Sequence, residues 1–278
     1  MDVRWHMKKL TRRAFVLGGR VARGLSPFAT RDVHRAVRVL TYHVIGREPR
    51  NPFAVDSTSF ATQVRWIAES GRALSLENFT AFLGGASDVP PGALLVTLDD
   101  GDVSLVEAAA PLLAAHGVPA VAFVPAGEVG TRPAGLRDRR VSWNELQAVS
   151  RAGISVGSHA WTHESLGGLS PAEIRTQGER SRKTLEDRLG VPVTAFAYPF
   201  GTRRDFNATT RQILHEVGYE LLFTSQHGAV RVVSDPLALP RIKVEGGEGM
   251  WMFRGLARGG LDGWAMVDRT MWRLQASA

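Results

Sequence analysis

From about residue 36, short apolar runs rich in β-formers alternate with segments that have the apolar period of helices, and this alternation constrains the fold most. The runs are continuously apolar, as expected for parallel strands that are covered on both faces. Seven such units without a change in composition predict an α/β fold, namely a distorted and incomplete (β/α) barrel of the TIM-like kind. We expect the strands at residues 37–42, 93–98, 119–124, 153–158, 193–198, 219–224 and 237–244.

The segments between these runs carry helix start and stop signals. Ser142 with Glu145 predicts one capping box, and Ser170 with Glu173 predicts another, whose helix ends at Gly190. In a barrel of this kind, chemistry gathers where strands end and loops begin.

Composition narrows the candidate chemistry. The chain has 278 residues and no cysteine, so any metal must be held by His, Asp or Glu. The net charge of +7 is concentrated at the N-terminus, because residues 1–40 carry ten Lys and Arg against two Asp. The other 238 residues carry 24 Lys and Arg against 25 Asp and Glu, so the body is nearly neutral and nucleic acid is not an expected partner.

We define residues 1–36 as a basic N-terminal arm. Within it, LTRRAFVLGG (residues 10–19) resembles a twin-arginine export signal, although its apolar stretch is short. Contact with anionic lipid is an alternative interpretation, and cytoplasmic, membrane-peripheral and exported locations all stay open. Because the motif-bearing units begin at about Val37, we expect the arm to be dispensable for the chemistry.

The stretch VTLDDGD (residues 96–102) ends an apolar run with Asp99 and Asp100 side by side. Adjacent carboxylates repel each other, and burying either is unfavourable unless a cation or a set of donors compensates. A polar turn after a strand is the alternative interpretation.

A second strand runs directly into SHAWTH, which contains His159 and His163. Residues four apart can converge on one point from a helical turn or a compact loop. Two strand ends that supply two His and one or two Asp form a facial set for a divalent cation with open positions. Zinc is the first choice for this cation, with cobalt and manganese as alternatives.

A third strand ends in AYPFG, where the backbone N–H that follows Pro199 is a candidate oxyanion donor at the same rim. The order DDG, SHxxxH, YPFG resembles that of the polysaccharide deacetylase family, also called the NodB-homology domain. LTYHVIG (40–46) and residues 60–79 look like its poly-N-acetylglucosamine-deacetylase-like branch. The resemblance covers residues 37–245.

This resemblance implies an incomplete (β/α) barrel and metal-dependent hydrolysis of N-acetyl groups on amino sugars. Carried over to this sequence, Asp100, His159 and His163 hold the metal, and Asp99 is the general base. The amide of Phe200 helps to hold the oxyanion. One carboxylate of the pair then binds the ion while the other accepts a proton.

Two positions depart from the family pattern. Ala197 stands where the family often has an Arg, and no late Leu-x-His supplies a general acid. His227, in the loop before the last strand, is our candidate for that acid, and His43 at the end of the first strand is the alternative. The expected substrate-binding residues are His43, Tyr198, Pro199 and Arg241.

The expected partner is an N-acetylated glycan or glycolipid. The same site could instead hydrolyse a small amide or ester, or the chain could be a catalytically dead carbohydrate-binding module. Residues 246–278 form a tail that contains Trp and Arg and either packs on the barrel or makes a peripheral membrane contact.

Overall fold

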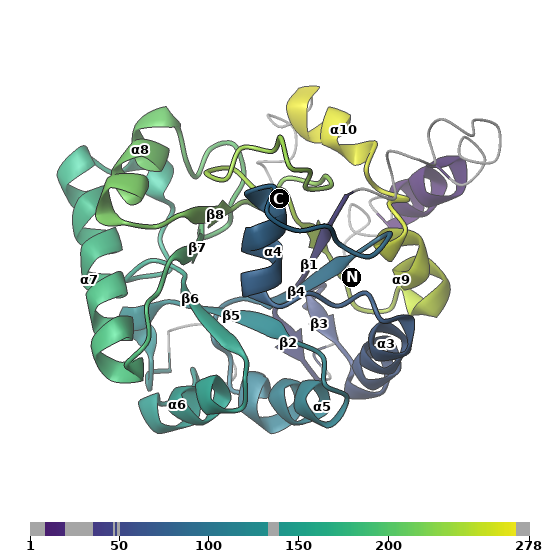
Figure 1. Cartoon of the computed structure of the whole chain (residues 1–278), viewed down its shortest axis with the longest axis horizontal. Coiled ribbons are helices and arrows are strands. Elements are labelled where there is room, and N and C mark those ends of the chain that lie inside the picture. Colours follow the sequence, from purple (N-terminus) through teal and green to yellow (C-terminus); the bar gives the residue numbers. More distant parts are fainter. Residues whose placement is uncertain (1–8, 20–35, 47, 49–50, 133–138, 271–278) are drawn as a thin grey trace.

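The computed structural model describes residues 9–19, 36–46, 48, 51–132 and 139–270. Seven parallel strands form one curled sheet in the order β8-β7-β6-β5-β4-β1-β9, with helices around it (Figure 1). Each strand falls within one of the seven runs expected from the sequence, so the predicted fold class is confirmed. The strands are β1 (Arg38–Tyr42), β4 (Leu94–Leu98), β5 (Ala120–Val124), β6 (Ser155–Ser158), β7 (Ala195–Ala197), β8 (Leu221–Phe223) and β9 (Ile242–Lys243).

The segment that leads into β9 nearly closes the sheet into a barrel. Leu239 forms a parallel bridge with Phe223 of β8, and Pro236 accepts a hydrogen bond from Leu222. A few residues later, β9 pairs with β1 on the opposite edge of the sheet. One continuous segment therefore contacts both edges, as an incomplete barrel requires.

Helices cover the outside of the curled sheet, as Figure 1 shows. Short elements add to them at the strand ends, including the parallel pair β2 (Val44–Ile45) and β3 (Ala54–Val55). The helices are α3 (Ser57–Ser70), α4 (Leu76–Leu83), α5 (Ala110–Ala115), α6 (Trp143–Arg151), α7 (Pro171–Leu189), α8 (Ala208–Val217), α9 (Gly249–Ala257) and α10 (Trp264–Thr270). Three single turns are also present: η1 (Leu105–Ala109), η2 (Ala126–Glu128) and η3 (Leu166–Gly168).

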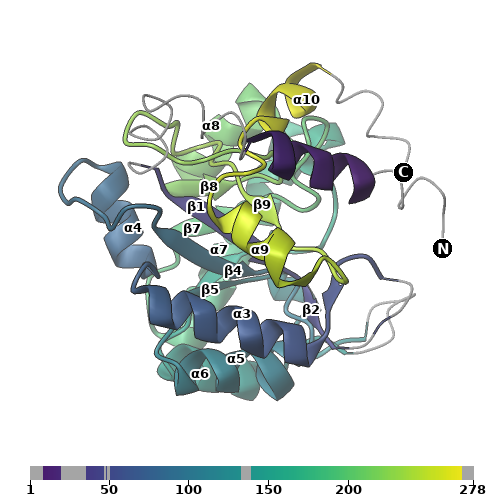
Figure 2. The same ribbon diagram turned by 90° about the vertical axis from the view of Figure 1, so that its right-hand side faces the viewer.

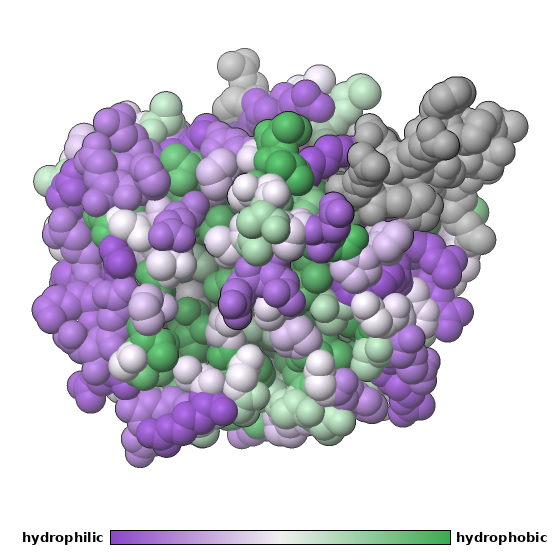
Figure 3. Space-filling view, viewed as in Figure 1, coloured by the Kyte–Doolittle hydropathy of each residue, from purple (hydrophilic) through white to green (hydrophobic). Residues whose placement is uncertain are grey.

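The predicted helix ends are present. Ser142 and Glu145 form a reciprocal capping box on α6, and Ser170 and Glu173 form one on α7. Gly190 ends α7 in the left-handed conformation, where a glycine has no Cβ to clash. Outside its buried stripe, α7 supplies much of the hydrophilic surface at the left of Figure 3. No helix in the described ranges has the length and apolar character needed to cross a membrane.

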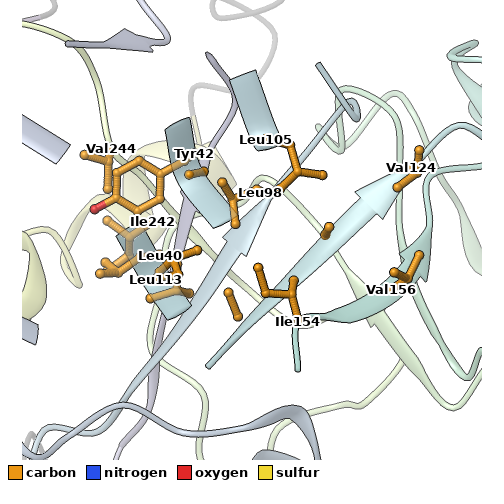
Figure 4. Packing of buried hydrophobic residues seen from close by; sticks show 14 of the residues in the cluster. Leu40, Tyr42, Leu98, Leu105, Leu113, Val124, Ile154, Val156, Ile242 and Val244 are labelled. Atoms are coloured by element: carbon orange, nitrogen blue, oxygen red, sulfur yellow. The ribbon is translucent and has the colours of Figure 1, made fainter. Parts of the chain in front are cut away.

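Alternate residues along each strand point to opposite faces of the sheet, which divides the core in two. Leu94, Val96 and Leu98 of β4 belong to the larger buried cluster, which packs against the surrounding helices. Figure 4 shows Leu98 and several of its partners from neighbouring strands within this cluster. Leu95 belongs instead to a second cluster on the concave face. Asp99 continues the concave series of β4.

The second cluster forms an apolar layer on the concave face. Phe79 of α4 packs against Phe223, with ring centroids 5.8 Å apart, and Phe123 packs against Phe223 at 5.3 Å. In Figure 1, α4 lies over the centre of the barrel. Beyond this apolar layer, polar side chains follow two of the strands, with Asp99 after β4 and His159 after β6. The fold thus separates an apolar floor from a polar rim.

The described parts of the terminal segments pack on the barrel, which is one of the two interpretations given for the tail. Residues 9–19 form a helix, here called the N-terminal helix, in which Arg12 and Val16 are fully buried. The tail forms α9 and α10 and contributes Phe253 and Leu256 to the core. Part of the basic arm is therefore an integral layer of the fold, because its helix packs against these C-terminal elements.

Candidate metal centre and active site

Three side chains with metal-binding atoms converge at the carboxyl end of the sheet. Asp100 follows β4, and His159 and His163 follow β6. The Nε2 atoms of His159 and His163 lie 3.4 and 3.2 Å from Oδ1 of Asp100. The three ligand atoms lie within 4.8 Å of one another, and they form the one such group found in the described parts of the chain.

Two backbone contacts orient His159. Its N–H donates to the carbonyl of Val124, which continues the pairing of β5 with β6. Its ring Nδ1 lies 2.7 Å from the carbonyl oxygen of Ala197, and a carbonyl can only accept, so Nδ1 carries the proton. Nε2 is therefore unprotonated, and its lone pair points toward Asp100. A hydrogen bond from the other ring nitrogen commonly orients a metal-binding histidine in this way.

The environment of the Asp100 carboxylate is the one expected if a cation binds between it and the two imidazoles. Its Oδ1 is buried and has no hydrogen-bond partner, although two imidazole nitrogens face it. Burial would raise the pKa of Asp100, but His159 and His163 outweigh burial and hold it well below the usual value. Burial would lower the pKa of His163, but Asp100 outweighs it and raises it. An ionised carboxylate and two imidazoles that face one another match the preferences of a divalent cation.

Left-handed backbone turns occur at all three strand ends that carry the motifs. Asp100, Ala160 and Phe200 have φ values of 72°, 67° and 57°, which are uncommon for residues other than glycine. Gly101 follows with φ of 62°, and a Cβ there would lie 2.6 Å from Cγ1 of Val124. Such conformations cluster at functional sites because they aim side chains and amides in directions that a regular strand cannot.

Asp99 has a different environment from Asp100. It is 3% exposed, and its Oδ1 and Oδ2 accept hydrogen bonds of 2.8 and 2.7 Å from the two terminal nitrogens of Arg241. Nε of Arg241 donates to the carbonyl of Thr224, so the guanidinium is held on both sides. Burial would raise the pKa of Asp99, but the charge of Arg241 outweighs it and lowers it. Arg241 therefore contacts Asp99 and is itself buried, whereas the sequence had suggested a substrate contact.

His43 lies beside this pair. It directly follows β1, next to the end of β4, where the N–H of Asp99 donates to the carbonyl of Tyr42. Its ring lies against Phe53, with centroids 5.0 Å apart, and its Nδ1 is buried without a hydrogen-bond partner. Burial lowers its pKa, although Asp100 and Asp99 act in the opposite direction.

The residues of the YPFG turn point in different directions, with Phe200 exposed and Tyr198 buried under the helices. Phe200 is 56% exposed, with its ring 4.8 Å from that of His163. Its N–H donates no hydrogen bond to any described residue. Pro199 is buried, and Tyr198 is fully buried on the helix-covered face, where its hydroxyl donates to Leu237. Tyr198 thus supports the turn and does not present its ring to solvent.

His227 has its contacts elsewhere. Its Nδ1 lies 3.1 Å from Oδ2 of Asp268, and its Nε2 lies 3.4 Å from a terminal nitrogen of Arg12. Its ring faces Trp264, and burial lowers its pKa despite Asp268. These partners belong to the terminal helices, so the structure brings His43, and not His227, to the two aspartates.

Two further side chains support the histidine loop. Oε1 of Gln177 accepts hydrogen bonds from the backbone N–H groups of Trp161 and Thr162, each 2.9 Å long. Oε1 of Glu128 accepts one from the N–H of His163. Gln177 lies in the middle of α7, where nothing in the local sequence marks it, and it could be found only from the tertiary structure.

Strand-end Asp and His residues on the rim of a parallel barrel define a (β/α)-barrel enzyme with a candidate metal site.

The family model described as polysaccharide deacetylase matches residues 86–222. The putative polysaccharide deacetylase YxkH of Bacillus subtilis is 24% identical over 210 residues, covering 75% of this chain and 71% of that protein. A poly-β-1,6-N-acetyl-D-glucosamine N-deacetylase of Staphylococcus aureus is 22% identical over 202 residues, covering 69% and 68%.

The solved structure of IcaB from Ammonifex degensii superposes with a TM-score of 0.68 and 28% identity, covering 81% of this chain and 97% of that one. Residues 86–222 therefore form a polysaccharide deacetylase domain. His43 and Arg241 both lie outside the range matched by the family model.

Proposed function

We propose that the protein is a metal-dependent hydrolase that removes N-acetyl groups from an amino-sugar glycan and releases acetate. The observation that carries this proposal is the convergence of Asp100, His159 and His163 beside a second, separately held carboxylate. The names of the relatives support the substrate class, since one is a poly-β-1,6-N-acetyl-D-glucosamine N-deacetylase.

Asp100, His159 and His163 would hold the metal, for which zinc is the first choice and cobalt and manganese are alternatives. A divalent cation, when bound, supplies Lewis-acid polarisation of a carbonyl and lowers the pKa of water. The buried Oδ1 of Asp100 and the proton on Nδ1 of His159 support this assignment, because both leave lone pairs directed to one point.

Asp99 would be the general base. A carboxylate has about four lone-pair positions, and Arg241 occupies two of them, which leaves others free to accept a proton. Arg241 keeps the carboxylate ionised and fixes its orientation, so we assign it a positioning role. At the third strand end, the uncommitted N–H of Phe200 would donate to the developing oxyanion.

We assign the general acid to His43 in place of His227. His43 is adjacent to Asp99 across the β1–β4 pair, whereas the contacts of His227 are with Asp268 and Arg12. A proton carried on the His43 ring would pass to the leaving amine. This acid supplies the function of the absent Leu-x-His and supports an active enzyme over a catalytically dead binding module.

Acetate release tests the proposal. Purified protein is incubated with chito-oligosaccharides, poly-N-acetylglucosamine and peptidoglycan, each with and without added zinc, cobalt or manganese. We expect release from at least one glycan, loss of release on chelation and its recovery when metal is added back. Asp100→Asn should lose both metal and activity, whereas the matched control Asp88→Asn, at an exposed position, should keep both.

Three outcomes would contradict the proposal. Acetate release that persists after chelation would show that the reaction does not depend on a metal. Turnover of a small acetyl ester without turnover of any glycan would assign the site to a small substrate. Glycan binding by a folded, metal-loaded protein that releases no acetate would define a binding module.

A further inference from the structure

Three helices from the two ends of the chain lie together on the face shown in Figure 2: the N-terminal helix, α9 and α10. Phe15 meets Trp264 edge to face, with ring centroids 5.0 Å apart. Val16 packs so closely on α9 that a Cβ on Gly255 would lie 2.4 Å from its Cγ1. We call the outward surface of these helices the three-helix face.

Buried ion pairs fix the orientation of the N-terminal helix. Arg12 is fully buried; its Nε lies 2.8 Å from Glu248, a terminal nitrogen lies 3.4 Å from Glu245, and the other donates to the carbonyl of Lys243. One side of the helix is therefore held against the protein. Its other side faces outward and carries exposed residues.

Exposed apolar side chains are present on all three helices. Leu10 and Leu17 are 63% and 53% exposed, and their spacing of seven residues places them on the same face of the helix. Trp251 of α9 and Met266 of α10 are also exposed. These four account for half of the eight large hydrophobic side chains that are exposed in the described residues.

Charges on the three-helix face are sorted by sign. The exposed charged side chains of the three helices, and of the residue that follows α9, are all arginines, namely Arg13, Arg254, Arg258 and Arg269. All four acids between residues 245 and 270 are instead paired within the protein. Glu245 and Glu248 pair with Arg12, Asp262 pairs with Arg38, and Asp268 pairs with His227.

We propose that the three-helix face binds the surface of an anionic lipid bilayer. Leucine, tryptophan and methionine would enter the headgroup layer while the arginines pair with lipid phosphates, the arrangement of helices that lie in a membrane interface. Exposed leucines favour a bilayer over nucleic acid, for which cations and stacking aromatics are the usual contacts. The basic sequence flanking the N-terminal helix, six Lys and Arg against two Asp in residues 1–8 and 20–35, has the matching sign.

Such binding goes beyond the proposed deacetylase activity and has a geometric consequence for it. The N-terminal helix contacts the carbonyls of Lys243 and Gly246, at the carboxyl end of β9. The candidate active site lies at the same end of the strands. A bilayer bound to the three-helix face would therefore lie beside the rim of the site.

Vesicle flotation with the full chain tests this proposal. Vesicles of phosphatidylcholine alone are compared with vesicles that also contain phosphatidylglycerol, and we expect binding to depend on the anionic lipid and to weaken with salt. Arg13→Glu should weaken partitioning by about fivefold or more, the value of one cation near such a surface. Leu10→Ser/Leu17→Ser should weaken it by about tenfold, since both side chains insert only partly.

Matched controls come from other surfaces. Arg151→Glu changes an exposed arginine on α6, away from the three-helix face (Figure 1), and Val191→Ser/Val233→Ser changes two exposed apolar residues elsewhere. Both controls should bind like the unchanged protein, and all four variants should keep its thermal unfolding midpoint.

The proposal is wrong if the full chain binds neither kind of vesicle, or binds both equally. It is also wrong if the face variants partition like their controls. Retention of duplex DNA in place of vesicles would assign the face to nucleic acid. A concentration-dependent dimer that Leu10→Ser/Leu17→Ser abolishes would assign it to a second copy of the chain.

Discussion

Arg241 donates one hydrogen bond to each carboxylate oxygen of Asp99, across 142 residues of sequence. Both side chains are almost fully buried, so neither charge is compensated by water. The pair joins the residue before β9 to the residue after β4. It also gives Asp99 a different partner from Asp100, which faces His159 and His163. A bidentate buried pair of this kind is strong only while both partners are present.

Removal of Arg241 should therefore destabilise the protein. Arg241→Met leaves the carboxylate of Asp99 buried without its cation, and we expect the free energy of unfolding to fall by about 3–5 kcal/mol. Urea unfolding measures the change. The double variant Arg241→Met/Asp99→Asn should recover part of the loss, since no unpaired charge then remains, and a double variant less stable than Arg241→Met would contradict this account.

The two aspartates should respond differently to the same substitution. Asp100→Asn should lose bound metal, since an amide offers no anionic lone pair, and excess metal should restore part of the activity. Asp99→Asn should keep the metal but lower the rate of acetate release by about 10²–10⁴-fold, because an amide cannot accept the proton. Metal content and acetate release are measured on both purified proteins, and the reverse pattern would exchange the two roles.

Two histidines compete for the role of general acid, and single substitutions distinguish them. His43→Ala should lower kcat by about 10²–10⁴-fold with metal content unchanged, because the ring lies beside Asp99. His227→Ala should leave kcat nearly unchanged and lower stability, since Asp268 and Arg12 lose a buried partner. A large loss of kcat for His227→Ala alone would restore the assignment first made from the sequence.

Local patterns in the sequence were enough to predict the barrel and the convergence of Asp and His side chains at one edge of the sheet. Continuous apolar runs located the seven strands, and parallel strands bring Asp100 and His159 to one edge without any knowledge of packing. The period of two also assigns Tyr198 to the face opposite Ala197, which explains its burial.

Contacts between distant segments could not be predicted in this way. Arg241 approaches Asp99 only because the sheet curls until β9 lies beside β1, and Arg12 approaches Glu248 across 236 residues. Neither pairing has a local period or a turn signal. The same holds for His227. Its place in a loop suggested a role at the rim, whereas in the structure its ring contacts Asp268.

The capping box of α6 should give a pH-dependent contribution to stability. Arg139 and the Ser142 cap hold the pKa of Glu145 at about 2, below its ordinary value of 4.5. A lowered pKa stabilises the fold above the unfolded-state value, and this contribution is lost as the pH falls through 4.5 toward 2. Glu145→Gln should thus cost about 1 kcal/mol or less at pH 7, and the difference should shrink across that range.

Thermal unfolding of both proteins between pH 7 and pH 3 measures this difference. Glu220→Gln, at an exposed position, is the control and should show no such trend. A Glu145→Gln deficit that stays constant across the range would show that the charge of Glu145 does not matter.

Finally, the two adjacent arginines of the N-terminal helix should behave in opposite ways. Arg12 is fully buried between Glu245 and Glu248, which outweigh burial and raise its pKa, whereas Arg13 is exposed. Arg12→Ala should lower the free energy of unfolding by about 3–5 kcal/mol, because two buried carboxylates lose their shared cation. Arg13→Ala should change it by about 0.5 kcal/mol or less, as is usual for surface positions.

Deletion of residues 1–19 should destabilise the protein at least as much as Arg12→Ala, because it also removes Phe15 and Val16 from α9 and α10. The sequence predicted only that the arm is dispensable for the chemistry, which is a property separate from stability. Urea unfolding of the three proteins measures the change in stability. Equal stability of Arg12→Ala and Arg13→Ala, or a deletion variant as stable as the full chain, would show that the N-terminal helix is not needed by the folded domain.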